Sequence, residues 1–451
     1  MTPVLAALLL IAVVGGPFAS LVGPFPRRRT SIALGFLFGC VVVATILLSL
    51  TLLSIRWSRT SVLLPLFIML ALAIVFTHSA RVAHETPAQS GQPAGPWPRI
   101  FDCGTLLVLL GYFLYATATA PWNWDFWAIW GLKGRAFWET RGIDWSFLTR
   151  PDNSFVQPAY PPLIPLLFDF IATLAGRWTD RYLGLLNFAF GVALLVIVRD
   201  FLDEEIGPFY AALSTLGLTT CCLTDWIGLA EGGFISLSMT GLLLMRRALA
   251  ARSRRLLLAS AVLLGFAAVT KQEGISLIIA TGLALLTTPW GRTLPVIRDF
   301  TLSAIPSVTW AIIGLVHHLS NDVFFAADAG RRFVTHLHHP ESLLQPMLAD
   351  GDARLSLWVL AAVAFALAGP RFVRSERFLL IALPCQVAFF IGAYLISTMD
   401  LAWHIATSWG RVTEQVNAPL LYLACVALAT TLGQEKLTDA GSAETISLSD
   451  R

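Results

Sequence analysis

The stretch that decides the fold is Ser31-Ile-Ala-Leu-Gly-Phe-Leu-Phe-Gly-Cys-Val-Val-Val-Ala-Thr-Ile-Leu-Leu-Ser-Leu-Thr-Leu-Leu-Ser54, which contains no charged residue. A helix needs about 20 apolar residues to cross the hydrocarbon core of a bilayer. Lipid offers the backbone no hydrogen-bond partner, so a segment of this kind must satisfy its own peptide groups as a helix. The stretch therefore predicts a transmembrane helix.

The composition of the whole chain also indicates that it folds in a lipid membrane. Of the 451 residues, 56% are hydrophobic and only 13% are charged, whereas a soluble domain carries roughly 25% charge. The net charge of +3 is too small for a nucleic-acid partner. The partner that the composition predicts is the lipid bilayer.

Further apolar runs follow along the chain. The predicted spans are 2–23, 31–54, 60–77, 104–120, 160–176, 182–199, 208–224, 229–245, 256–270, 274–289, 299–319, 353–369, 378–397 and 415–432. The predicted fold class is all-α: a polytopic transmembrane bundle of about 13–14 spans with interfacial helices in an extracytoplasmic loop.

Arginine clusters predict the orientation, because basic loops favour the cytoplasmic side. They lie at 27–29, 246–255 and 371–377. These positions predict a multi-pass protein of the plasma (inner) membrane whose motif-bearing loops face the extracytoplasmic side. If 160–176 crossed the membrane completely, the later loops would face the opposite side, and the arginines at 246–255 would not be cytoplasmic. We therefore predict that this segment re-enters or lies along the interface, unless another span is misassigned.

The pattern divides the chain into three parts. Residues 1–100 form an N-terminal transmembrane module. Residues 101–432 form the main transmembrane module, which contains the outer loop 121–159. Residues 433–451 are polar and rich in Ser, Asp and Glu, which predicts a disordered cytoplasmic tail.

The outer loop opens with Pro121-Trp-Asn-Trp-Asp125-Phe-Trp-Ala-Ile-Trp-Gly-Leu-Lys133. Tryptophan favours the membrane–water boundary, so this stretch predicts short interfacial helices. Asp125 lies among the aromatic residues, where burial makes a carboxylate a better base. The plainer interpretation is that Asp125 caps a helix, and the two roles are compatible. Lys133 is one of only three lysines.

A proline-rich stretch, Gln157-Pro-Ala-Tyr160-Pro-Pro-Leu-Ile-Pro165, follows the loop. Proline is tolerated where a helix begins, so these residues predict a rigid connection into the membrane. A structural role is sufficient for this stretch, and a functional role through Tyr160 is secondary.

Charged residues also open two later spans. Glu231 lies in Ala230-Glu-Gly-Gly233, and Lys271 and Glu273 lie in Thr270-Lys-Gln-Glu-Gly274. The apolar runs on either side of Lys271 are short, so the tip between them is predicted to be recessed below the headgroups. Charges at that depth usually mark a functional site. The alternative is that Lys271 pairs with Glu273 or Glu231 only to hold helices together.

The last informative segment runs from Ser397 to Arg411. His404, Thr407, Ser408 and Arg411 recur at helical spacing and are predicted to share a polar face suited to phosphate or sugar. A solvated helix end would look similar. The histidines at 317–318 and 336–339 could bind a metal, but no flanking Cys or carboxylate completes a recognised ligand spacing, so no metal site is predicted.

Taken together, these motifs resemble the GT-C superfamily of membrane glycosyltransferases, and in particular bacterial relatives of protein O-mannosyltransferases and aminoarabinose transferases. The resemblance covers about residues 121–415. It implies a polyprenyl-phosphate-linked sugar donor, a hydroxyl or amine acceptor on a glycan, lipid or protein, and Asp125 as the general base. By this resemblance Lys271, Arg411 and Lys133 would stabilise the leaving phosphate. Glu231, Glu273, His404 and Tyr160 would contact or orient the substrates. No cofactor is expected.

Two other functional classes remain open. A secondary transporter or lipid flippase shares the hydropathy and the buried charges, but it predicts two similar halves with broken helices at matching positions. A non-catalytic membrane assembly subunit would tolerate replacement of Asp125 and Arg411. The sequence identifies neither the sugar nor the acceptor.

Overall fold

In the computed structural model, every regular element of the described residues is a helix. The structure describes the backbone of residues 1–23, 25, 27–80, 95–222, 227–319, 328–349 and 352–449. It describes their side chains except at 76–80, 221–222, 352–354 and 433–449. Nine helices in this part of the chain are long and apolar enough to cross a membrane. The predicted all-α, polytopic membrane bundle is confirmed.

The first half of the chain contains α1 Thr2–Val22, α2 Arg28–Leu52, α3 Arg59–Ala80, α4 Pro96–Ala118, η2 Phe126–Trp130, α5 Gly131–Thr140, α6 Trp145–Thr149, η3 Pro151–Val156, α7 Leu163–Ala175, η4 Asp180–Tyr182 and α8 Gly184–Cys222. The second half contains α9 Glu231–Ala251, α10 Arg254–Ala268, α11 Glu273–Leu286, α12 Leu294–Phe300, η5 Thr301–Ala304, α13 Ile305–Val316, α14 Ala329–His338, α15 Pro340–Ala349, α16 Asp352–Ser375, α17 Arg377–Ile396 and α18 Leu401–Ser449.

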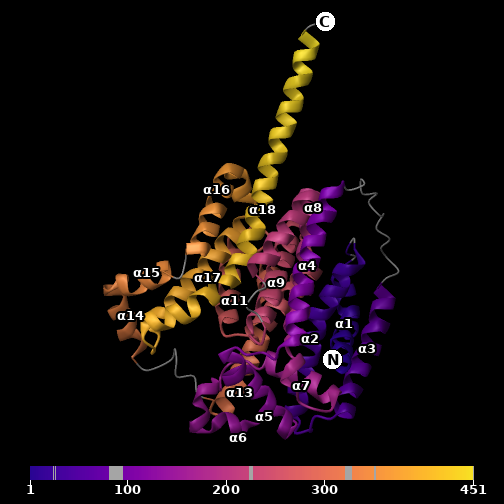
Figure 1. The fold of residues 1–451 in the computed structure, drawn as a ribbon, viewed down its shortest axis with the longest axis vertical. Helices are drawn as coiled ribbons and strands as arrows, with labels where there is room; N and C mark the ends of the chain where they lie inside the picture. The colour runs from indigo at the N-terminus through magenta and orange to yellow at the C-terminus, as the bar shows by residue number, and fades with distance from the viewer. Residues whose placement is uncertain are drawn as a thin grey trace.

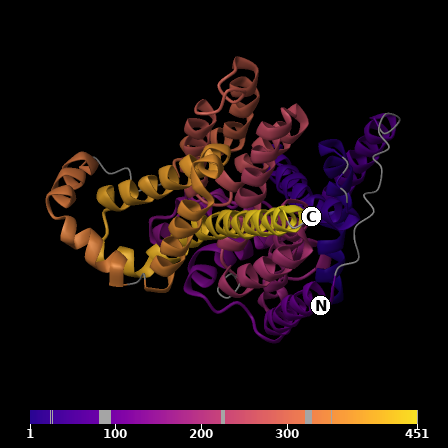
Figure 2. The ribbon, with the colours of Figure 1, turned by 90° about the horizontal axis from the view of Figure 1, so that it is seen from above.

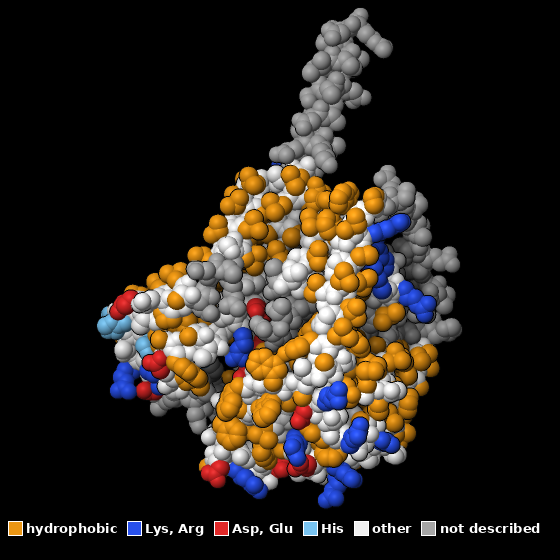
Figure 3. All heavy atoms as spheres, viewed as in Figure 1, with side chains coloured by type: hydrophobic (Ala, Val, Ile, Leu, Met, Phe, Trp, Pro, Cys, Tyr) orange, Lys and Arg blue, Asp and Glu red, His pale blue; other side chains and the backbone are white. Residues whose placement is uncertain are grey.

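Helices α1–α3 and helices α14–α16 lie on opposite sides of the bundle. Figures 1 and 2 show α1–α3 on one side, α14–α16 on the other, and α8 and α9 between them. Figure 3 shows hydrophobic side chains over most of the upper and middle surface and many charged ones along the lower rim. This distribution suits a protein whose middle lies in lipid.

Helix α8 accounts for two of the predicted spans. Gly207 has φ 77° and ψ 168°, which breaks the helix just before Pro208. On either side of the break, Arg199 binds Asp102 and Phe209 packs edge-on against Phe101. Both halves therefore lie beside the start of α4, as expected for two helices that meet at a turn. This arrangement agrees with predicted spans at 182–199 and 208–224.

The segment predicted not to cross the membrane is a short helix. Helix α7 has 13 residues, so it is about 20 Å long against a core of roughly 30 Å. Its first residue, Leu163, donates to the carbonyl of Val269. Shortly after its end, Trp178 packs near Gly134 of α5. Figure 1 places α7 beside α5 at the lower end of the bundle, and its re-entrant or interfacial position stays a prediction.

Helix α18 begins earlier than the predicted span at 415–432. Its first turn starts at Leu401, where the Asp400 carboxylate accepts from the backbone N–H of Trp403 at 2.8 Å. The segment from Ser397 to Arg411, whose polar residues recur at helical spacing, is therefore helical from Leu401 onward, and Asp400 caps this helix. The predicted tail, 433–451, lies outside the residues whose side chains are described. Between the predicted spans 299–319 and 353–369, the chain forms α14 and α15, and residues 320–327 and 350–351 are not described.

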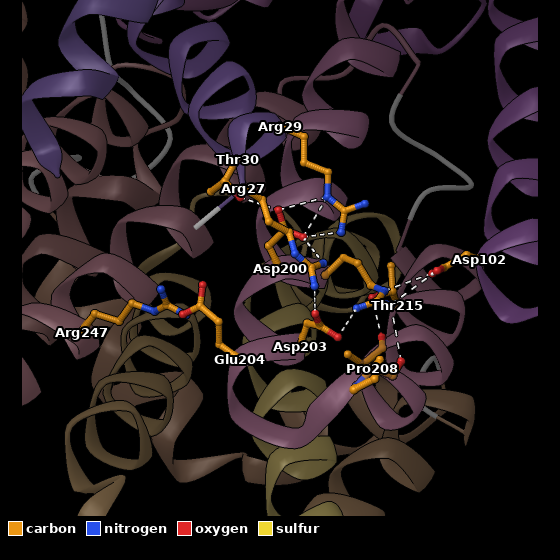
Figure 4. Close-up of polar contacts among 12 residues, drawn as sticks. Arg27, Arg29, Thr30, Asp102, Asp200, Asp203, Glu204, Pro208, Thr215 and Arg247 are labelled. Atoms are coloured by element: carbon orange, nitrogen blue, oxygen red, sulfur yellow. Dashed lines mark hydrogen bonds and ion pairs between the residues drawn. The ribbon is translucent and has the colours of Figure 1, made fainter. Parts of the chain in front are cut away.

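One end of the bundle is held by ion pairs between separate helices, and we call it the arginine-rich end. Figure 4 shows Arg27 and Arg29 directed at Asp200 of α8, with Asp203 and Asp102 nearby. Further pairs at this end join α9 to α8 and α17, and α10 to α12; they are Arg246–Glu205, Arg246–Glu376, Arg247–Glu204 and Arg254–Asp299. The predicted cytoplasmic arginine clusters thus lie at the same end.

Helices α1 and α2 cross unusually closely. A methyl group on Gly15 would lie 1.8 Å from the carbonyl oxygen of Gly35 and 2.3 Å from the amide nitrogen of Gly39. Small residues let helix backbones approach in this way within membranes. Helix α2 also packs on α8, where Phe36 meets Phe190 with ring centroids 5.2 Å apart. The division of the chain at residue 100 stays a prediction, although α1 and α2 pack directly on later helices.

We predict that Gly15→Ala lowers the free energy of unfolding by about 2 kcal/mol, because the added methyl group forces the two backbones apart. The measurement is the thermal unfolding midpoint of the detergent-purified protein. Gly16→Ala is the matched control, because a methyl group there meets no described atom within 4 Å. Equal midpoints for the two variants would contradict the close packing of α1 on α2.

Candidate functional site

Five charged side chains converge at the end of the bundle opposite the arginine-rich end. They are Asp125, Glu231, Lys271, Glu273 and Arg411, and we call this group the charged site. Helix α9 shows that the two groups lie at opposite ends of the bundle. Glu231 is its first residue, and Arg246 lies near its other end, about 22 Å away along the axis. Four separate segments of chain supply the five residues.

Ion pairs and close charge contacts link all five residues into one continuous row. Arg411 Nη1 contacts Asp125 Oδ2 and lies 3.8 Å from Glu231 Oε1. Lys271 Nζ donates to Glu231 Oε1 at 2.8 Å and lies 3.0 Å from Glu273 Oε1. Three carboxylates therefore share two cations, which leaves a formal charge of −1 if all are ionised.

The site is buried on one side and open on the other. The Glu231 and Lys271 side chains are 2% and 9% exposed, whereas Asp125, Glu273 and Arg411 are 21%, 26% and 31% exposed. Lys271 therefore forms ion pairs with both Glu231 and Glu273, as the second interpretation of the sequence predicted. The exposed edge formed by Asp125, Glu273 and Arg411 is what a ligand can reach.

Each carboxylate lies where a helix begins. Asp125 immediately precedes η2, Glu231 is the first residue of α9 and Glu273 is the first residue of α11. The partial positive charge of a helix N-terminus favours an acidic side chain. Three such N-termini meeting at one end explain why acidic residues gather here. They also favour a bound anion if a carboxylate moves aside.

Gly228 allows the loop bearing Asp125 to approach α9. It has φ +81°, and a methyl group there would lie 2.6 Å from Pro121 and 3.0 Å from Phe126. The turn is held by Asn187 of α8, which accepts from the N–H of Gly228 at 3.1 Å and donates to the carbonyl of Leu229 at 2.8 Å. This contact brings Asp125 and Glu231 to the same place.

Asp125 does not act as a helix cap. It precedes the π-helix η2, but its side chain accepts no capping hydrogen bond and instead pairs with Arg411. The expected interfacial helices of the outer loop are present as η2, α5, α6 and η3. Trp122, Trp124 and Trp127 are exposed beside Asp125, as expected for a stretch at the membrane boundary.

Lys133 lies apart from the charged site. Its Nζ donates to the carbonyl of Gln157 at 2.6 Å and to that of Tyr160 at 3.3 Å, and it faces the Trp130 and Tyr160 rings. Burial without a carboxylate partner lowers the pKa of Lys133 to about 7. In this structure Lys133 fixes the proline-rich connection to α5, so its predicted contact with a leaving phosphate gains no support.

Tyr160 lies between Lys133 and the charged site. Its ring stacks on Trp130 with centroids 5.8 Å apart. Burial raises the pKa of the Tyr160 hydroxyl, and the negative charge of nearby Glu273 adds to the effect. The side chain is thus protonated at neutral pH and close enough to the site to sense its charges.

His404 belongs to a second polar group beside the charged site. Its Nδ1 lies 2.8 Å from Ser397 Oγ, and its ring meets Tyr394 edge-on. The Tyr394 hydroxyl in turn shares a 2.8 Å hydrogen bond with Ser408. The predicted polar face of the 397–411 segment is therefore present. Because Arg411 pairs with Asp125, this segment is not simply a solvated helix end.

Two further residues near the site, Tyr394 and Gln386, lie within the predicted span 378–397 and were not predicted as site residues. Gln386 donates to the carbonyl of Glu273 at 3.1 Å, and its Oε1 is buried without a partner among the described residues. Polar side chains within an apolar span are a known signal of function. That signal was present for both residues.

Within the described part of the chain, no group of three His, Cys, Asp or Glu side chains is arranged to hold a metal ion. His336 Nδ1 lies 2.9 Å from the carbonyl oxygen of Leu395, and His317 stacks on Trp145. His339 lies 3.2 Å from Glu341. These histidines are engaged separately at different places.

Comparison of the chain with protein-family models, curated proteins and solved structures found no match. The superfamily resemblance of the motifs therefore stays a prediction, and the site must be interpreted from its own geometry.

The lowered pKa of Lys133 predicts a pH-dependent stability. An unfolded lysine keeps its proton up to about pH 10.4, so between about pH 7 and 10.4 the unfolded state binds more protons than the folded one. Stability therefore rises with pH in that window. We expect the wild type to gain about 2 kcal/mol over Lys133→Met between about pH 7.5 and 9.

The measurement is the difference in thermal unfolding midpoint between the two proteins at each pH. Arg135→Met is the control, since Arg135 is exposed on the same helix and pairs only with exposed Glu139. A wild-type advantage that stays constant with pH would contradict a neutral, buried Lys133.

Proposed function

We propose that the protein is a membrane glycosyltransferase that moves a sugar from a polyprenyl-phosphate donor to a hydroxyl or amine acceptor at the charged site. The observation that carries the proposal is the ion pair between Arg411 and Asp125, residues 286 positions apart. It places a phosphate-binding cation beside a carboxylate that can accept a proton. These are the two groups that sugar transfer from a lipid phosphate requires.

Arg411 is the best partner for the donor phosphate. The contacts described for it use Nη1 alone, which leaves Nε and Nη2 without a partner among the described residues. Its side chain is 31% exposed. Arginine binds phosphate through two parallel N–H groups. Lys271 is largely enclosed by Glu231 and Glu273, so its main role in this proposal is to fix those carboxylates.

Glu231 is 2% exposed in this structure and is suited to bind a sugar hydroxyl that enters as Arg411 moves to the donor phosphate. Its Oε1 faces Lys271, while its Oε2 is buried and has no hydrogen-bond partner within the described residues. A buried carboxylate oxygen without a donor is costly. A hydroxyl group of a bound sugar would donate the missing hydrogen bond to Oε2.

The proposed reaction is one in-line displacement. Asp125 accepts the proton of the acceptor, the acceptor oxygen or nitrogen bonds to the anomeric carbon, and the bond from that carbon to the phosphate oxygen breaks. The electron pair leaves with the lipid phosphate, and Arg411 stabilises its charge. A phosphate leaving group needs no acid catalyst. Arg411 exchanges Asp125 for phosphate when the donor binds, which frees the carboxylate to act as the base.

The position of the site favours lipid-linked substrates. It lies beside exposed tryptophans and at the end opposite the arginine clusters, which favour the cytoplasm. We therefore propose that the reaction takes place on the extracytoplasmic face of the plasma membrane. His404 and Tyr394 lie nearby and are positioned to bind the acceptor or the sugar.

We predict that Asp125→Asn lowers sugar transfer by a factor of about 100 to 10,000, because the amide cannot accept the proton. The measurement is transfer from a panel of polyprenyl-phosphate sugars by the purified protein. Asp152→Asn is the control, since Asp152 is exposed in the same outer loop. Full activity of Asp125→Asn would exclude Asp125 as the base.

We also predict that Arg411→Gln reduces donor binding. The measurement is mass spectrometry of lipids that co-purify with the wild type and the variant. A polyprenyl phosphate or its glycoside should be present in the wild type and depleted by about tenfold in Arg411→Gln. Arg135→Gln, an exposed change in the same outer loop as Asp125, is the control. Transport of an intact lipid-linked sugar without transfer would favour the flippase alternative.

A further inference from the structure

A groove outside the charged site runs along the membrane-facing side of α1. It has a volume of about 590 Å³ and is bounded by α1, α2 and α3. This volume is within the usual range for small-ligand sites. The contribution of α1 is a single helical stripe, Leu9, Ala12, Val13, Gly16, Pro17 and Ser20.

The dimensions of the groove match one leaflet of a bilayer. From Leu9 to Ser20 the stripe is about 17 Å long, against about 15 Å for half of the hydrocarbon core. Leu9, Val13, Ile32 and Ile74 are all exposed along it. A single hydrocarbon chain can therefore lie in the groove from the headgroup level to the middle of the membrane.

A positively charged side chain, that of Arg28, lies at one end of the groove. Arg28 lines it, and it lies at the arginine-rich end, because its neighbours Arg27 and Arg29 bind Asp200 there. No ion pair of Arg28 exists within the described residues, so its charge is available to a ligand. Ser20 and Ser31 also line the groove and add polar atoms.

Gly16 keeps the groove open. A methyl group on Gly16 would meet no described atom within 4 Å, whereas one on neighbouring Gly15 would collide with α2. The two glycines therefore have different roles: Gly15 permits close packing of the helices, and Gly16 leaves space on the lipid side. A large side chain at position 16 would fill the groove without disturbing the helix pair.

We propose that this groove binds an anionic phospholipid of the cytoplasmic leaflet, with its phosphate on Arg28 and one acyl chain along the α1 stripe. Basic pockets between membrane helices on the cytoplasmic side suit anionic headgroups. The length of one leaflet favours an ordinary phospholipid over a long polyprenyl chain. This site is separate from the charged site and does not depend on the proposed function.

The experiment is native mass spectrometry of the purified full-length protein, titrated with phosphatidylglycerol or with phosphatidylcholine of the same acyl chains. The wild type should bind phosphatidylglycerol about tenfold more tightly. Arg28→Gln should abolish that preference, because the two lipids then differ by no specific contact. Gly16→Leu should weaken binding of both lipids, because leucine occupies the chain position.

Two matched controls should keep wild-type binding. Arg255→Gln removes an exposed arginine at the same end, and Gly111→Leu fills open space beside α4, where no described atom lies within 4 Å. If Arg28→Gln keeps the preference, the site is wrong. Tighter binding of polyprenyl phosphate than of phosphatidylglycerol overturns the choice of ligand. If Gly16→Leu does not fold, Arg28→Gln decides alone.

Discussion

The pairing of Arg411 with Asp125 is the contact on which the candidate site depends. It ties the C-terminal helix α18 to the outer loop and completes a row of five charges through Glu231, Lys271 and Glu273. Charges are costly in a membrane protein unless they are paired. Two cations among three carboxylates make the burial tolerable, and the partly exposed edge leaves room for one more anion to compete for Arg411.

The two ends of the bundle use charge in different ways. At the arginine-rich end, pairs such as Arg246 with Glu205 and Glu376 join neighbouring helices, although Glu205 Oε2 is buried without a hydrogen-bond partner among the described residues. At the charged site, Glu231 Oε2 lacks a partner and Arg411 uses one of its nitrogens. The charged site also lies beside the exposed Trp122, Trp124 and Trp127 of the outer loop. These features are the basis for proposing the second end as the place for chemistry.

The structure also assigns roles that residue type alone would confuse. Lys133 and Lys271 are both buried lysines beside a motif, but Lys271 is held between two carboxylates and Lys133 only by carbonyl groups and aromatic rings. Gly15 and Gly16 are adjacent, but a methyl group would collide with α2 at Gly15 and would meet no described atom at Gly16. In each pair, the neighbouring segments decide the role.

The sequence by itself determined the all-α membrane fold, since apolar runs of sufficient length can satisfy their backbone in lipid only as helices. It also marked Asp125, Glu231, Lys271, Glu273 and Arg411 as unusual, because each is a charge beside an apolar span. Only the tertiary structure decided that these five meet while Lys133 does not. Periodicity describes one helix at a time, whereas the approach of the outer loop to α9 depends on contacts between separate segments. Gly228, in the turn before α9, lies close to the outer loop, and Asn187 of α8 holds that turn.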